Sequence, residues 1–279
     1  MISRPQLDTI GDRIETGTYT LHSRFRRTAN YTAGSRLITL SRSSADRGPL
    51  TITLHTSRLP DCRKLIIEPG QITIDSQKIP VPGTSIYDSR LPPMGTFAQS
   101  SLDSCRQVLF RESPPGGMVH ALKNDSHPES KSAVEQAVIQ RLKAGYGLIL
   151  AGRVIRGARA LRGVGNGLTP SGDDMIAGFM WGLHAVAASS NIDVKRFCRR
   201  ILKTVQGENP ISNQAFIMAY NGWFPAGMKS LVTALAKGNK TATVHATRSM
   251  ISRGALSGSD ICAGFLAGIA FAGTPRSTV

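Results

Sequence analysis

Ser171-Gly-Asp-Asp-Met-Ile-Ala-Gly-Phe-Met-Trp-Gly182 decides the fold, because the chain repeats this stretch 86 residues later as Ser257-Gly-Ser-Asp-Ile-Cys-Ala-Gly-Phe-Leu-Ala-Gly268. Seven of the twelve positions are identical in the two copies. An offset of 86 residues is too long for one unit of a solenoid. The repeat therefore predicts two related helix starts within one helical domain.

Each copy has the features of a capped helix with a glycine face. Ser171 and Asp174 have the spacing of a capping box, in which both side chains satisfy backbone N–H groups, and Ser257 and Asp260 repeat it. Four glycines follow, two per copy and four residues apart in each: Gly178, Gly182, Gly264 and Gly268. We expect the two glycine faces to pack together and to bring both helix starts into defined positions.

A glycine-rich loop, Gly163-Val-Gly-Asn-Gly-Leu-Thr-Pro170, leads into the first copy. Such a loop can bind a small anion through backbone N–H groups at a helix N-terminus. It has no Gly-Lys-Ser/Thr of a Walker A motif, and it follows an arginine-rich helix rather than the strand of a dinucleotide fingerprint. Two interpretations stay open: a tight turn with a capping box, or an anion site that includes Asn166, Thr169 and Ser171.

Acidic residues are scarce after residue 115, with 8 Asp+Glu against 19 Lys+Arg, and three of the eight lie in the repeated motifs. Asp173 is not needed for the cap, so it could hold a metal, orient a substrate amide or favour the helix start.

We assign catalytic roles to Ser171, Asp173 and Asp174. Substrate binding is assigned to Asn166, Gly167, Thr169, Gly172, Ser257, Gly258, Asp260 and Arg162. No companion His or Glu spacing supports metal ligands, so none is assigned, and Mg²⁺ is kept only as an optional cofactor.

The charge of the chain is unusual for its size. Its 279 residues are 41% hydrophobic and 19% charged, as in globular proteins, but they carry a net charge of +16. Two basic stripes have helical spacing: Arg153, Arg156, Arg159 and Arg162, and then Lys195, Arg196, Arg199, Arg200 and Lys203. Each stripe is either a solvated helix face or a surface for an anion or a partner, and Arg159 or Arg162 could reach the loop.

Several classes of protein are disfavoured by motif searches. Only 6% of the residues are aromatic, and no helix-turn-helix, RNP or zinc-finger pattern occurs, so nucleic-acid binding is a minor alternative. The four cysteines form no CxxC pair, and we expect reduced thiols. The N-terminus has no apolar core of a signal peptide and no stretch is long enough to span a bilayer, so we expect a cytoplasmic protein.

The order of elements predicts an α+β fold. Short β-branched runs separated by Gly-Pro turns occur up to residue 95, and they predict a β-rich N-terminal domain, 1–95, built as a small antiparallel barrel or sandwich. Residues 96–279 predict a helical domain that carries both motifs. The expected helices span 97–111, 129–144, 148–161, 175–188, 194–205, 213–220, 228–237, 242–252 and 260–272.

The motifs resemble those of the AllH-like family, associated with oxamate carbamoyltransferase of allantoin and purine breakdown. Gly165-Asn-Gly-Leu-Thr-Pro-Ser-Gly-Asp-Asp174 is similar to the family's signature, and Leu256-Ser-Gly-Ser-Asp260 is similar to its second motif. Asn30, Leu37–Leu40 and Gly48-Pro49 resemble weaker N-terminal features, so the likeness runs through most of the chain. The lead-in Arg253-Gly-Ala-Leu departs from the family's His-Gly-Thr-like pattern.

The resemblance implies carbamoyl transfer between carbamoyl phosphate and oxamate or oxalurate, with a small anion held at helix N-termini. It also implies one subunit of a heteromer, whose other members are an acyl-CoA-synthetase-like protein and a second family partner. The alternative is a ligand-binding or scaffolding subunit that has no catalysis of its own.

Overall fold

The computed structural model describes residues 6–123, 132–190 and 193–273. The chain divides into two compact units, of which the first contains the residues up to Arg90 together with Trp223–Gly227. The second unit contains the remaining described residues, and all its regular elements are helices. Strands followed by helices confirm the α+β class.

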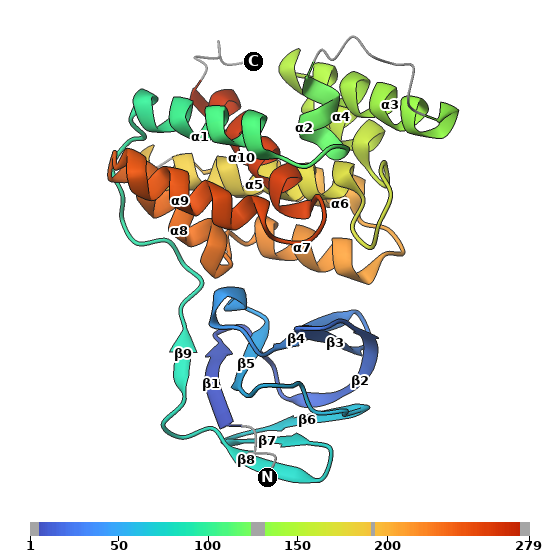
Figure 1. Cartoon of the computed structure of the whole chain (residues 1–279), viewed down its shortest axis with the longest axis vertical. Helices are drawn as coiled ribbons and strands as arrows, with labels where there is room; N and C mark the ends of the chain where they lie inside the picture. The colour runs from blue at the N-terminus through green and yellow to red at the C-terminus, as the bar shows by residue number, and fades with distance from the viewer. Residues whose placement is uncertain (1–5, 124–131, 191–192, 274–279) are drawn as a thin grey trace. The chain divides into compact units, whose positions relative to one another are not determined.

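The first unit is one curled, nine-stranded half-barrel sheet (Figure 1). The strand order across the sheet is β8-β7-β6-β2-β3-β4-β5-β1-β9. The strands are β1 (Gln6–Gly11), β2 (Gly17–Arg24), β3 (Thr28–Ala33), β4 (Arg36–Ser41), β5 (Thr51–His55), β6 (Lys64–Glu68), β7 (Gln71–Ile74), β8 (Gln77–Pro80) and β9 (Ser85–Tyr87). A short 3₁₀ helix, η1 (Ser44–Asp46), precedes β5.

The sheet differs from the expected antiparallel barrel or sandwich in two ways. It is a single layer, and among the described pairs β4 is parallel to β5 and β1 is parallel to β9. The parallel pairing of β4 and β5 arises because η1 carries the chain across between them, so that these strands are not joined by a hairpin. Pro80 ends the edge strand β8, as a residue without a backbone donor should.

The concave side of the sheet holds the core of the first unit. Tyr19, Tyr31, Leu40, Ile52 and Leu65 are among its fully buried side chains. Two aromatic rings this large can be buried because their hydroxyls find partners, as with the Tyr31 hydroxyl, which donates to the backbone oxygen of Cys62 at 3.0 Å.

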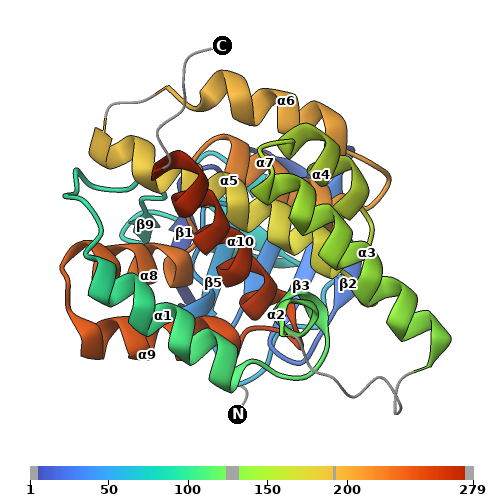
Figure 2. The same ribbon diagram turned by 90° about the horizontal axis from the view of Figure 1, so that it is seen from above.

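The second unit places α5 and α10 at its centre (Figure 2). Around them lie α3 and α4 on one side and α1, α8 and α9 on the other. The helices are α1 (Gln99–Glu112), α2 (Gly117–Leu122), α3 (Ala133–Leu150), α4 (Val154–Leu161), α5 (Ser171–Ser190), α6 (Lys195–Val205), α7 (Pro210–Tyr220), α8 (Ala226–Ala236), α9 (Lys240–Ile251) and α10 (Ser257–Gly273). Nearly all residues of α5 from Ser171 to Leu183 and of α10 from Gly258 to Ile269 are buried, which explains the almost continuous apolar sequence that follows the first turn of each helix.

The expected helix end at Gly145 is wrong. Helix α3 continues through Gly145 to Leu150, and α4 begins only at Val154. A Cβ at Gly145 would lie 2.6 Å from the Leu161 side chain, so this glycine permits α4 to pack against α3 rather than ending the helix. The start of the expected helix 129–144 falls partly outside the described residues.

The cysteines and the apolar helices agree with expectation where the structure describes them. All four cysteines are buried and unpaired. In the described part of the chain, no helix is long and apolar enough to span a membrane.

Candidate active site at the paired helix starts

The two copies of the repeat, α5 and α10, pack through their glycine faces as expected. A Cβ on Gly178 would collide with the backbone oxygen of Ile261, and one on Gly264 would collide with that of Met175. These contacts are equivalent under the 86-residue offset, since Met175 corresponds to Ile261. The two helices therefore meet in a reciprocal, pseudo-twofold arrangement that places both starts side by side.

The serines at these starts hydrogen-bond across the helix pair. Ser257 hydrogen-bonds with Asp174, and Ser171 hydrogen-bonds with Asp260. Thr169 Oγ1 donates to Asp174 Oδ2 at 2.8 Å and also lies 2.9 Å from Ser257 Oγ. The expected capping boxes within each copy are thus replaced by bonds between the copies. Ser171 and Ser257 are the first helical residues rather than the residues before them.

Asp260 caps a helix that the sequence did not indicate. Its Oδ1 accepts a hydrogen bond from the backbone N–H of Met118 at 2.6 Å, and its carboxylate also accepts from Val119. These are first-turn N–H groups of α2, so Asp260 holds α2 in place. A side chain at Gly117 would occupy the position of the Asp260 carboxylate, which explains why a glycine begins α2.

The three aspartates of the motifs are buried, with 5% of Asp173, 3% of Asp174 and none of Asp260 exposed. Burial raises the pKa of Asp174 to about 7 and that of Asp260 to about 6, and it also raises the pKa of Asp173. Asp173 Oδ1 accepts from the backbone N–H of Gly163 at 2.7 Å and so fixes the beginning of the glycine-rich loop. Each of these carboxylates has a structural partner.

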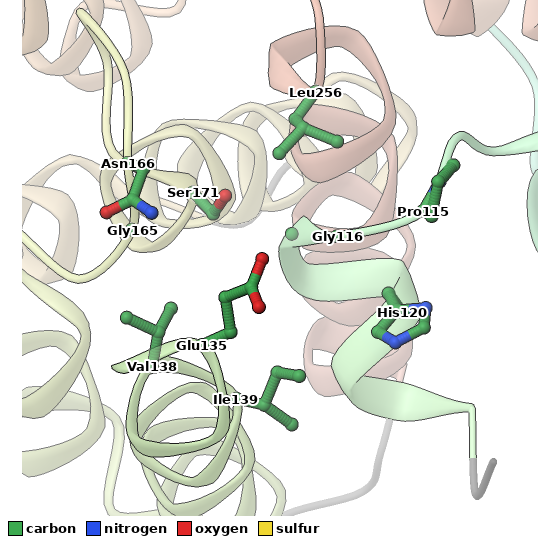
Figure 3. Close-up of a pocket in the computed structure, with 11 residues that line it drawn as sticks. Pro115, Gly116, His120, Glu135, Val138, Ile139, Gly165, Asn166, Ser171 and Leu256 are labelled. Atoms are coloured by element: carbon green, nitrogen blue, oxygen red, sulfur yellow. The ribbon is translucent and has the colours of Figure 1, made fainter. Parts of the chain in front are cut away.

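A cavity of about 360 Å³ opens beside the helix starts. Ser171 of α5, Asn166 of the loop and Leu256 before α10 form one side (Figure 3). The start of α2 and the first turns of α3 form the other, with Glu135 directed toward the centre of the cavity (Figure 3). The remaining lining residues are Pro115, Gly116, Gly117, His120, Val138, Ile139 and Gly165.

The walls of this cavity are apolar with a few polar groups. Ser171 supplies a hydroxyl, Asn166 an amide and Glu135 a carboxylate. Neither Lys nor Arg occurs among its lining residues in the described chain. Walls of this kind suit a small, uncharged hydrogen-bonding group such as an amide or carbamoyl group, and they exclude water from its apolar side.

The structure brings five of the assigned residues into two hydrogen-bonded groups at the paired helix starts: Thr169, Asp174 and Ser257 form one, and Ser171 and Asp260 form the other. Of all the assigned residues, Asn166 and Ser171 are the ones that line the cavity.

The other assigned residues have separate local roles. Gly172 packs against the backbone oxygen of Leu161, and Gly258 packs against that of Met250. Gly167 is exposed. Arg162 donates to the backbone oxygen of Gln206 at 3.3 Å and does not line the cavity.

The cavity walls formed by α2 and α3 were not predicted. Pro114-Pro115-Gly116-Gly117 had the composition of a linker, and α2 has six residues. The sequence did contain a pattern that marks the start of α3, because Ser132 and Glu135 have the spacing of a capping box. In the structure they form this box, and Ser132 N donates to Glu135 Oε2 at 2.9 Å.

Other expectations concern groups outside the cavity. His184 is half-buried, with its Nε2 2.9 Å from the backbone oxygen of Tyr220, and burial lowers its pKa. Among the described residues, no group of three or more His, Cys, Asp or Glu side chains could hold a metal ion. A role for Mg²⁺ stays a prediction.

Comparison with known proteins supports the motif resemblance. The family model described as oxamate carbamoyltransferase subunit AllH matches residues 161–269, from the last residue of α4 into α10. The searches of curated proteins and of solved structures give no match. The matched segment contains the glycine-rich loop, both repeat copies and the reciprocal helix pair. Over residues 161–269, the chain is therefore similar to the AllH family of oxamate carbamoyltransferase subunits.

Proposed function

We propose that this chain is a subunit of an oxamate carbamoyltransferase-like complex of ureide breakdown, and that the cavity beside α5 and α10 binds its small substrate. One observation carries the proposal. The segment that matches the family contains both motifs, and both motifs reach the cavity, the first through Asn166 and Ser171 and the second through Leu256.

The reaction would join the amide nitrogen of oxamate to the carbonyl carbon of carbamoyl phosphate. A C–N bond forms, the C–O bond to phosphate breaks, the nitrogen loses a proton, and oxalurate and phosphate result. Negative charge develops on the carbonyl oxygen, so donors fixed in advance would favour the transition state. The Ser171 hydroxyl, the Asn166 amide and the His120 imidazole are side chains on the cavity wall that can donate a hydrogen bond.

The raised pKa values favour an anionic substrate at this place. With a pKa of about 7, Asp174 is about half neutral at pH 7. The helix starts therefore repel an anion less than they would if the Asp174 carboxylate were fully charged. The positive ends of the α5 and α10 dipoles then add a modest attraction. We assign the carboxylate of oxamate to these helix starts and its amide to Asn166 and Glu135.

Binding can be tested by filling the cavity from α3. Val138→Trp would place an indole in the cavity, whereas Val134→Trp changes a side chain that is 67% exposed, one turn earlier on the same helix. Calorimetry with oxamate should show at least about tenfold weaker binding for Val138→Trp and unchanged binding for Val134→Trp. Equal affinities in the two variants, both folded by circular dichroism, would place the substrate elsewhere.

A second candidate is a binding subunit without catalysis. It is favoured by the lack of Lys and Arg among the described residues that line the cavity, because a leaving phosphate needs cations. Purified chain and chain reconstituted with its partner subunits would be supplied with carbamoyl phosphate and oxamate. Phosphate release by the chain alone supports a catalytic subunit. Oxamate binding with release only after reconstitution supports the binding subunit.

A further inference from the structure

Helices α4 and α6 of the second unit lie side by side and present one strongly basic surface. We name it the basic face, and it consists of Arg153 just before α4, Arg156 and Arg159 of α4, and Lys195, Arg196, Arg199, Arg200 and Lys203 of α6. All eight side chains are exposed. At 1.5 Å per residue, the two helices are about 12 and 16 Å long.

The described part of the chain has few acidic residues that could neutralise these cations. From residue 136 to residue 207 there are eleven Lys+Arg and three Asp+Glu, and two of the acids, Asp173 and Asp174, are buried beneath the glycine-rich loop. In the described residues, Arg153, Arg156 and Arg200 form no ion pair. Eight like charges on two adjacent helices repel one another, so the face costs stability unless something outside the unit neutralises it.

A hollow of about 420 Å³ lies within the basic face. Arg153, Arg156 and Arg200 surround it, and Phe197 of α6 supplies an aromatic wall. Phe197 is itself held by stacking on Phe271, with ring centroids 5.7 Å apart. A rigid aromatic wall ringed by guanidinium groups matches the composition of protein–protein contacts, in which Arg and aromatic residues are enriched.

We propose that the basic face binds an acidic patch on another protein chain of the complex, with carboxylates entering the hollow between Arg153, Arg156 and Arg200. The proposal takes from the family description that this chain is a subunit, and it adds the surface and the charge of the partner. Bidentate pairing with carboxylates suits arginine, and six of the eight cations are arginines.

Other occupants fit the surface less well. A second copy of this chain carries +16 and would be repelled. A small anion would stay hydrated, because the three guanidinium groups are exposed. Single-stranded nucleic acid binds to platforms of several aromatic rings, whereas Phe197 is the aromatic residue in the lining of the hollow.

The test uses the full chain and a 20-residue poly-glutamate peptide as the acidic probe. Arg156→Glu/Arg200→Glu reverses two charges of the basic face, and Lys237→Glu/Lys240→Glu makes the same change on the turn between α8 and α9, away from α6 in Figure 2. We expect the Kd for the peptide to rise at least about tenfold in the first variant and less than about threefold in the second, with binding weakened by salt. Equal losses in the two variants would show diffuse attraction and overturn the proposal.

Two competitors and one reconstitution complete the test. Displacement of the peptide by millimolar inorganic phosphate would indicate a small-anion site. A 20-base DNA strand that binds more tightly than the peptide would indicate a nucleic-acid surface. Either result would overturn the proposal. With the partner subunits, Arg156→Glu/Arg200→Glu should bind oxamate normally yet fail to co-elute. Co-elution as for the unaltered chain would also overturn it. Failed oxamate binding by the unaltered chain would instead contradict the proposed function alone.

Discussion

At the residue scale, the buried carboxylates of Asp174 and Asp260 are the main finding. The sequence assigned a catalytic role to Asp174 and substrate binding to Asp260. The structure shows that both carboxylates join the two repeat copies and that Asp260, through Met118, caps α2. An acid can therefore shape a site without lining it. Asp260 holds the first turn of α2, and that turn forms a wall of the cavity.

Stability should depend on pH through Asp260. Its folded pKa of about 6 lies above the ordinary value of 3.8, so its contribution is full below pH 4 and is lost as the pH rises through about 6. Asp260→Asn retains an acceptor for Met118 N–H but cannot titrate. Between pH 4.5 and 7.5, urea unfolding should show the unaltered protein losing on the order of 2 kcal/mol more than Asp260→Asn.

The exposed Asp103→Asn on α1 serves as the control and should keep the slope of the unaltered protein. If the slopes of all three proteins coincide, Asp260 has an ordinary pKa in the folded state.

At the scale of elements, long apolar or amphipathic segments were predictable and contact-dependent ones were not. The repeat correctly predicted α5, α10 and their close packing. It could not predict α2, because α2 is held by Asp260, which lies 142 residues away in the sequence. Strand β2 was also missed, because its less exposed face is largely polar and Tyr19 is its one fully buried residue, although its exposed and less exposed positions alternate regularly. Asn166 and Ser171 were found at the cavity because a motif marks them, whereas its apolar walls carry no motif.

The glycine contacts between α5 and α10 lead to a prediction about helix packing. Gly264→Ala would drive a methyl group into the backbone oxygen of Met175 and should destabilise the protein by about 3 kcal/mol or more. Gly147→Ala lies in the middle of α3, where a Cβ meets nothing within 4 Å, and should stabilise it by roughly 0.5–1 kcal/mol. Thermal unfolding of both variants measures this, and equal effects would contradict the close packing of α5 and α10.

At the scale of the whole molecule, the chain does not leave the first unit for good at Arg90. It returns between α7 and α8, where Trp223–Gly227 is part of that unit. Phe224 is buried there, with its N–H donating to the Ser89 oxygen at 2.8 Å and its oxygen accepting from the Tyr87 hydroxyl at 2.9 Å. Sequence composition gave no indication of this return, because Tyr220-Asn-Gly-Trp-Phe224 has the pattern of an ordinary turn.

The returning segment should keep the two units together after one cut. A protease site inserted between Pro93 and Gly95, in the exposed stretch that follows the first unit, would be cleaved in the folded protein. The two fragments should co-elute in gel filtration, because Trp223–Gly227 stays bound in the first unit. Phe224→Ala removes the buried ring of that segment and should let the fragments separate. Separation without the substitution would contradict this role.

The reciprocal contacts of α5 and α10 have a consequence for ancestry. Met175 touches Gly264 as Ile261 touches Gly178, so each copy uses one patch twice, as the two halves of an isologous homodimer do. Gene duplication followed by fusion of a self-associating helical segment would leave this pattern. After such a fusion the two halves would be free to diverge. The two copies contribute different residues to the cavity lining: one contributes Ser171 and its loop, and the other contributes Leu256.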